Sequence, residues 1–93
     1  MRYYQIYAWT ECPFCVHAKE ILIQKEEQFM FCCLEQSDAL LKYIKKKYNW
    51  ETVPLIIEKN TMSNEEKFLG GFTDLVKYLE EEQNEENKQT MGK

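Results

Sequence analysis

Blocks of hydrophobic and polar residues along the chain predict seven secondary-structure elements. Segments rich in β-branched and aromatic residues alternate with segments in which apolar positions recur every three or four residues. We expect strands at residues 3–8, 29–34, 53–57 and 68–69, and helices that follow cap signals at residues 12, 37–38 and 72–74. The resulting order, β-α-β-α-β-β-α, indicates an α/β fold with a mixed four-stranded sheet flanked by helices.

A Cys-x-x-Cys motif lies where the first predicted strand gives way to the first predicted helix. Cys12 precedes Pro13, and proline is favoured at the first helical position because an N–H there would have no helical partner. Cys12 therefore lies at the N-terminal cap, where free backbone N–H groups and the helix dipole favour negative charge. We expect this position to lower the pKa of the Cys12 thiol below the free value of roughly 8.5, which makes Cys12 the nucleophile. Cys15, one turn later on the same side, is the predicted resolving thiol.

The central part of the chain continues this order. The second predicted strand follows the first helix closely, as in a β-α-β unit, so we expect the two strands to be parallel. The second helix carries its lysines on or near its solvent side: Lys42, Lys45, Lys46 and Lys47. The third strand begins at a proline, a position where proline is tolerated. The polar residues 58–67 predict a hairpin connection, and Gly70-Gly71 predicts a turn in which backbone can approach closely.

Composition and length limit the classes of function. The chain has 93 residues, of which 44% are hydrophobic and 30% charged, so we expect one soluble globular domain. Apolar residues nearly vanish after residue 80, which divides the chain into a domain of residues 1–82 and an acidic, mobile tail of residues 83–93. A net charge of −4 argues against nucleic acid as a partner, and no apolar run is long enough to span a membrane. Four cysteines without a secretory signal favour a reducing compartment, the cytoplasm.

Three separated motifs carry a resemblance to a known family. They are Cys12-Pro13-Phe14-Cys15, Thr52-Val53-Pro54 and Gly70-Gly71-Phe72-Thr73-Asp74. In this order and at these separations they resemble the glutaredoxins of the thioredoxin superfamily, and in particular the dithiol class with its CPFC-type motif. The resemblance covers about residues 3–80. It implies a thioredoxin-like fold and a glutathione-dependent thiol-disulfide oxidoreductase that reduces protein–glutathione mixed disulfides and protein disulfides.

The resemblance also implies which residues bind glutathione. The proline of Thr-Val-Pro is cis in the family, so we expect Pro54 to be cis and the backbone of Val53 to pair with glutathione as an added strand would. Thr73 and Asp74 match the positions that hold the γ-glutamyl end. The implied binding residues are Phe14, Thr52, Val53, Pro54, Gly71, Phe72, Thr73 and Asp74. The two phenylalanines among them would form apolar walls.

The family further implies glutathione as a co-substrate, with no bound cofactor and no metal. Its partners would be glutathionylated or disulfide-containing proteins, with ribonucleotide reductase as one candidate, and we expect a monomer.

Trp9 departs from the family, because many glutaredoxins carry Lys or Arg at this position, and Phe14 replaces the commoner Tyr. Lys42, Lys45 and Lys46 are the nearest alternatives for the missing positive charge. The segment 58–67 is longer than in compact relatives and could contact a protein partner.

Several candidate residues have simpler interpretations. Zinc binding by the motif cysteines together with Cys32 and Cys33 is disfavoured, because adjacent strand residues point to opposite faces. We instead expect Cys32 and Cys33 to be small apolar residues in or behind the sheet. His17 should face solvent, turned away from the nucleophile. Trp9 is either a wall of the substrate groove or a structural anchor, and the sequence leaves both open.

Two other functions are alternatives to the oxidoreductase. Some glutaredoxins hold a [2Fe–2S] cluster between two subunits through the first cysteine and bound glutathione, but Pro13 counts against that role here. A redoxin reduced by thioredoxin reductase instead of glutathione is the other alternative. The match at Thr73-Asp74 argues against it, and the absent positive charge at Trp9 argues for it.

Overall fold

The structure is a computed structural model that describes the backbone of residues 1–35 and 37–91, with side chains described up to residue 82. Its elements follow the predicted order: β1 (Arg2–Trp9), α1 (Pro13–Gln24), β2 (Phe29–Leu34), α2 (Ala39–Lys47), β3 (Leu55–Asn60), β4 (Glu66–Gly70) and α3 (Phe72–Met91). The predicted thioredoxin-like fold, with a mixed four-stranded sheet and flanking helices, is confirmed. Among the described helices none is both long and apolar enough to cross a membrane.

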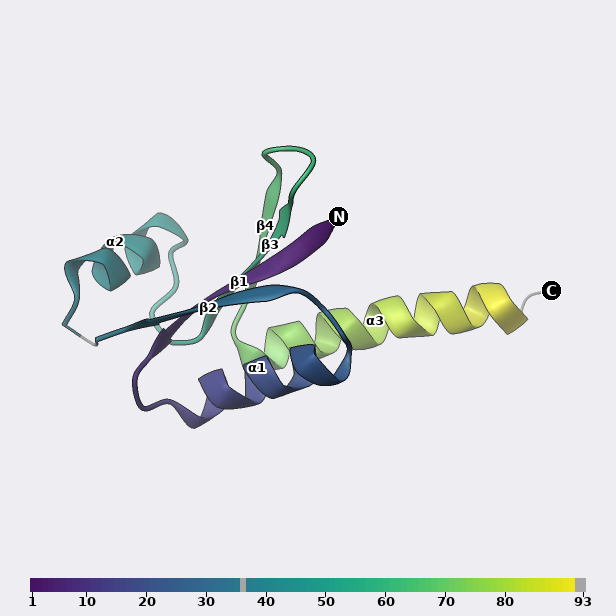
Figure 1. Cartoon of the computed structure of the whole chain (residues 1–93), viewed down its shortest axis with the longest axis horizontal. Coiled ribbons are helices and arrows are strands. Elements are labelled where there is room, and N and C mark those ends of the chain that lie inside the picture. Colours follow the sequence, from purple (N-terminus) through teal and green to yellow (C-terminus); the bar gives the residue numbers. More distant parts are fainter. Residues whose placement is uncertain (36, 92–93) are drawn as a thin grey trace.

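The sheet has the strand order β2-β1-β3-β4 (Figure 1). As expected, β1 and β2 are parallel, because α1 returns the chain to the same end of the sheet. β3 pairs antiparallel with both β1 and β4. The C-terminal end of β1 leads directly into the Cys-x-x-Cys segment, so the sheet fixes where α1 begins.

The larger hydrophobic core lies between one face of the sheet and the helices α1 and α3, which run side by side in Figure 1. Successive residues of β1 point to opposite faces, and its even-numbered residues Tyr4, Ile6 and Ala8 are fully buried in this core. The buried residues that face them from other elements are Cys15, Ala18, Leu22, Ile56, Leu75 and Leu79. Burial of these apolar side chains is the main stabilising contribution to the packing of both helices.

Helix α2 packs on the opposite face, near the C-terminal end of β1. Leu41 and Ile44 of α2 are buried together with Leu55 of β3, and Tyr7 and Trp9 of β1 pack against them. Asp38 caps the helix, because its Oδ1 accepts the N–H of Leu40 at 2.8 Å, as the sequence predicts.

Two strand predictions are wrong in their boundaries. β3 begins at Leu55 rather than Val53, so Val53 and Pro54 belong to the preceding loop. The strand also continues through the polar residues 58–60, and β4 begins at Glu66. Half of the segment 58–67, predicted as a connection, is therefore paired strand, and the loop is confined to residues 61–65. Polar side chains did not prevent pairing, because the ladder uses backbone groups, and β1 pairs with β3 as far as Asn60.

Helix α3 extends to Met91, beyond residue 82, where the sequence suggests that the domain ends. Its first turn contains Asp74, and its buried residues Leu75 and Leu79 face the sheet. The division into a domain of residues 1–82 and a mobile tail of residues 83–93 stays a prediction, and residues 92–93 lie outside the described part of the chain.

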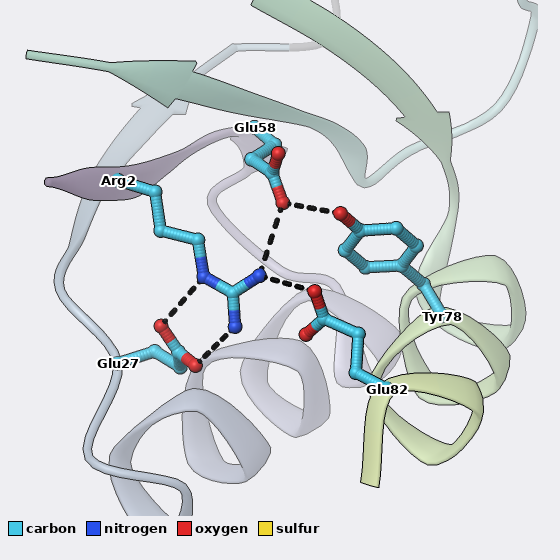
Figure 2. A network of polar contacts seen from close by, with 5 residues as sticks. All are labelled: Arg2, Glu27, Glu58, Tyr78 and Glu82. Carbon is cyan, nitrogen blue, oxygen red and sulfur yellow. Dashed lines mark hydrogen bonds and ion pairs between the residues drawn. The ribbon is translucent and has the colours of Figure 1, made fainter. Parts of the chain in front are cut away.

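Arg2, at the start of β1, connects three other parts of the chain through its guanidinium (Figure 2). Its Nε and Nη2 donate to the two carboxylate oxygens of Glu27, between α1 and β2, at 3.3 and 2.7 Å. Its Nη1 donates to Glu58 of β3 at 3.3 Å and to Glu82 of α3 at 2.5 Å. Tyr78 of α3 donates its hydroxyl to the same oxygen of Glu58 at 2.6 Å. The network therefore links β1 to β3, to α3 and to the segment between α1 and β2.

This network contains more negative than positive charge. Three carboxylates surround one guanidinium, and the four side chains are only 20% to 33% exposed. The hydrogen bonds to Glu82 and Glu27 raise the pKa of Arg2. Burial, followed by the hydrogen bond to Glu58, raises the pKa of Tyr78. Without Arg2 the three carboxylates would face one another without a counter-charge in this network.

We predict that Arg2→Gln lowers the free energy of unfolding at pH 7 by about 1–3 kcal/mol. Lys77→Gln removes an exposed cation from α3 and should change that free energy by less than about 0.5 kcal/mol. Urea unfolding followed by circular dichroism measures both. The deficit of Arg2→Gln should shrink when the salt concentration is raised from about 0.05 M to about 1 M, because salt screens the repulsion among the three carboxylates. An equal deficit at both salt concentrations would rule out carboxylate repulsion as its cause.

Candidate active site

Cys12 occupies the N-cap of α1, as predicted, and Pro13 follows it at the start of the helix. Its backbone is extended (φ −151°, ψ 103°), and its carbonyl accepts the N–H groups of Cys15 and Val16 at 3.1 and 3.2 Å. The N–H of Cys15 also lies 3.3 Å from the Cys12 sulfur and donates to it. A negative charge on this sulfur would therefore face the positive end of the helix dipole.

The two motif cysteines are bonded to each other but differ in exposure. They form a disulfide with their Cα atoms 5.2 Å apart. Cys15 is 1% exposed and belongs to the larger core, whereas Cys12 is half-buried at its margin. An external disulfide can therefore reach Cys12 more easily than Cys15, which agrees with the predicted roles of attacking and resolving thiol.

A groove of about 350 Å³ lies beside the N-terminus of α1. It is lined by Phe14, Trp50, Thr52, Val53, Pro54, Gly71, Phe72, Thr73 and Asp74. All eight residues that the family resemblance implies for glutathione are in this group, so the fold brings the three separated motifs together. The Val53–Pro54 peptide bond is cis, as expected.

Asp74 lies in the first turn of α3 and helps to cap that helix. Its Oδ2 accepts the N–H of Gly71 at 3.0 Å, while the carbonyl of Gly71 accepts the N–H of Leu75 at 3.0 Å. Gly70 has a φ of +119°, and a Cβ placed on it would lie 2.5 Å from Oδ2 of Asp74. A Cβ on Gly71 would meet its nearest atom at 3.6 Å, an ordinary contact. The first glycine, not the second, is therefore required for the position of the carboxylate.

We predict that Gly70→Ala lowers the free energy of unfolding by about 1–3 kcal/mol, because alanine is strained at this φ and its Cβ displaces Asp74. The adjacent Gly71→Ala is the matched control and should cost less than about 1 kcal/mol, since its Cβ meets only ordinary contacts. Chemical denaturation of both variants measures the difference. Equal losses would mean that the contact with Asp74 is unimportant.

Trp9 is a structural anchor and not a wall of the groove. Its side chain packs in the cluster between α2 and the sheet, and it is not among the residues that line the groove. The Nζ of Lys45 lies 5.0 Å from the centroid of its ring. Lys45 is half-buried, whereas Lys42 and Lys46 are exposed. The position where the sequence lacks a basic residue therefore has an ammonium group above it, contributed by α2.

Two aromatic features of the site were not found from the sequence. His17 is exposed, as expected, but its ring lies 5.9 Å from that of Phe72 and 6.4 Å from that of Phe14. Trp50 lines the groove although it belongs to none of the three motifs. Its place two residues before Thr52 is the only signal for this role in the sequence.

The other two cysteines lie on β2, an edge strand of the sheet. Cys32 is half-buried and Cys33 is exposed, so Cys33 is in the sheet but contributes nothing to the core. Neither forms a disulfide. Within the described residues no group of three or more His, Cys, Asp or Glu side chains is arranged to hold a metal ion.

Comparisons with known proteins bear on the fold and on part of the chain. The family model for glutaredoxin matches residues 5–61, which include the Cys-x-x-Cys and Thr-Val-Pro motifs. No curated protein matches the chain in sequence. The solved structure of Glutaredoxin 1 from Francisella tularensis, complexed with cacodylate, is similar with a TM-score of 0.67 and 22% identity. That likeness covers 90% of this chain and 99% of the other, and at such identity it establishes the fold alone.

Proposed function

This chain belongs to the glutaredoxin family, and we propose that it is a dithiol member that takes its electrons from glutathione. Family and fold support a thiol-disulfide oxidoreductase. One observation above all supports the finer proposal: the more accessible sulfur of the Cys-x-x-Cys pair lies at a helix N-terminus beside a groove lined by all eight implied glutathione residues. The function is thus the reduction of protein–glutathione mixed disulfides and protein disulfides.

In the first proposed reaction Cys12 acts alone. Its thiolate attacks the glutathione sulfur of a protein–glutathione mixed disulfide, so that the protein leaves as a thiolate and takes up a proton. Cys12 then carries glutathione in a new mixed disulfide. A second glutathione thiolate attacks the glutathione sulfur of this intermediate, which releases oxidised glutathione and restores the Cys12 thiolate.

In the second proposed reaction Cys15 takes part. Cys12 attacks a protein disulfide and forms a mixed disulfide with the protein, and the first protein thiol leaves. The Cys15 thiolate attacks the sulfur of Cys12, which releases the second protein thiol and closes the Cys12–Cys15 disulfide. Two glutathione molecules then reduce this disulfide in two exchange steps and become oxidised glutathione.

The groove suggests how glutathione is oriented. We assign its γ-glutamyl end to Thr73 and Asp74, where the carboxylate of Asp74 can pair with the ligand's ammonium group. The ligand's carboxylate on the same carbon would meet the N-terminus of α3. The backbone of Val53, next to Pro54, would pair with the cysteinyl residue as an added strand does.

We further assign the glycyl carboxylate to Lys45. This lysine is supported by its contact with the ring of Trp9, 5.0 Å from Nζ to the centroid, which holds the charge at the position of the family's basic residue. The backbone N–H of Trp50, a groove residue, donates to the carbonyl of Lys45 at 2.9 Å. Lys42 and Lys46 are exposed and have no such link to the groove among the described contacts.

The proposed partners are glutathione and glutathionylated or disulfide-containing proteins, with ribonucleotide reductase as one candidate. We propose a monomer that acts in the cytoplasm, since four cysteines and an exposed thiol at Cys33 suit a reducing compartment.

We predict that the two cysteines separate the two reactions. Cys15→Ser should retain most of the reduction of a small glutathione mixed disulfide, measured with glutathione reductase as the coupling enzyme, and should lose the reduction of a protein disulfide. Cys12→Ser should lose both activities by more than about 100-fold, because the thiolate is the nucleophile. Cys33→Ser, at an exposed cysteine outside the site, is the matched control and should retain both. If Cys12→Ser turned over near the wild-type rate, the nucleophile would be misassigned.

We predict that Asp74→Asn raises the Michaelis constant for glutathione by about 5- to 50-fold, because it removes a charged partner of the ligand's ammonium group. The alkylation rate of Cys12 by iodoacetamide should stay within about twofold. Asp38→Asn neutralises a carboxylate at the N-terminus of α2, outside the groove, and serves as the matched control. An unchanged Michaelis constant in Asp74→Asn would mean that the γ-glutamyl end binds elsewhere.

A further inference from the structure

We propose that Trp50 is a specificity-determining residue of the groove, where it takes an apolar side chain of the cysteinyl peptide whose disulfide Cys12 attacks. This rests on the proposed function, since it concerns the substrate of the same groove. Trp50 is the one described lining residue that lies outside the three motifs. It is half-buried, and the bond from its backbone N–H to the carbonyl of Lys45 fixes it at the end of α2.

Aromatic rings dominate the walls of the groove. Phe14 and Phe72 lie with their ring centroids 6.1 Å apart, and Trp50 adds a third ring on the side of Gly71, where its Cζ2 lies 3.7 Å from the position of a Cβ. Asp74 is the one ionisable side chain among the described lining residues, and it already accepts a hydrogen bond. The three rings favour an apolar peptide side chain, and the carboxylate of Asp74 repels an acidic one. Lys45, which we assign to the glycyl carboxylate of glutathione, is not among the residues that line the groove.

The indole is supported from behind by further aromatic rings. Phe68 of β4 packs edge-on against Trp50 with centroids 5.4 Å apart, and it stacks on Tyr48 at 5.0 Å. The hydroxyl of Tyr48 donates to Glu66 at 2.8 Å; burial, followed by this bond, raises the pKa of Tyr48 to about 12. Tyr48 follows α2, whereas Phe68 and Glu66 belong to β4, so two elements fix the orientation of Trp50.

Phe68 is therefore a positioning residue. It packs against Trp50 and Tyr48 but does not line the groove, so it can affect a substrate only through the ring it supports. Loss of its ring should leave the indole free to rotate, whereas tyrosine at this position keeps the same edge-on contact.

The test uses two short peptides that differ only in the residue beside their single cysteine, Phe in one and Glu in the other. Each cysteine is capped as a mixed disulfide with 2-mercaptoethanol. Cys12 attacks the peptide sulfur, and the mercaptoethanol thiolate leaves. One glutathione thiolate then attacks the Cys12 sulfur, which releases the peptide as a thiol and leaves Cys12 bonded to glutathione. A second glutathione thiolate attacks the glutathione sulfur of this disulfide, which releases oxidised glutathione and restores the Cys12 thiolate. Coupling to glutathione reductase gives kcat/KM for each peptide.

We expect the wild-type protein to prefer the Phe peptide by about tenfold. Trp50→Ala should reduce this preference to about twofold, chiefly by raising KM for the Phe peptide. Phe68→Leu should give a preference between these two values, and Phe68→Tyr should keep the preference of the wild-type protein. Tyr43→Ala removes an aromatic ring that is 63% exposed on α2 and should leave the preference unchanged.

A wild-type protein that reduces both peptides equally well would overturn the inference, as would an unchanged preference in Trp50→Ala. If Trp50→Ala does not fold, Phe68→Leu replaces it in the test, because this variant keeps the indole. An unchanged preference in Phe68→Leu would then overturn the inference. Failure of the wild-type protein to reduce even a small glutathione mixed disulfide would instead overturn the proposed function, and the inference with it.

Discussion

The packing of α1 beside α3 on one face of the sheet brings two helix N-termini to one place. The rings of Phe14 and Phe72, each in the first turn of its helix, lie with centroids 6.1 Å apart, so the positive ends of both helix dipoles meet at the groove. A sulfur occupies the cap of one helix and a carboxylate the first turn of the other. Both helices therefore direct the positive ends of their dipoles at the site. The sheet on which the two helices pack fixes these positions.

Much of the fold could be predicted because its signals are local. The β2 strand, the N-cap at Cys12 and the cap at Asp38 follow from residues within one turn or one strand, and all three agree with the structure. The hairpin of β3 and β4 was predicted, but the extension of its strands into residues 58–60 and 66–67 was not, because these polar residues look like a loop although pairing depends on backbone groups. The Arg2 network could not be predicted at all, since its partners lie 25, 56 and 80 residues away in sequence.

The residues of the groove, too, could be predicted only in part. Its eight motif residues were identified by resemblance, and the fold places them together. Trp50 was missed because a tryptophan before a strand is equally consistent with a core residue, and it does in fact contact Phe68 of the smaller cluster. The lysine above Trp9 could not be chosen from the sequence either, because several lysines of α2 share the helical spacing and only the tertiary packing distinguishes Lys45.

The placement of the two tryptophans has a spectroscopic consequence. Trp9 and Trp50 both lie in the cluster between α2 and the sheet, whereas the larger core around α1 and α3 contains Tyr4 as its buried aromatic residue. Intrinsic tryptophan fluorescence therefore reports on one half of the molecule, while far-ultraviolet circular dichroism is dominated by the two longer helices of the other half. If a treatment loosens α2 before the rest of the molecule, the tryptophan emission changes before the ellipticity does. The order of these two signals therefore distinguishes local opening from global unfolding.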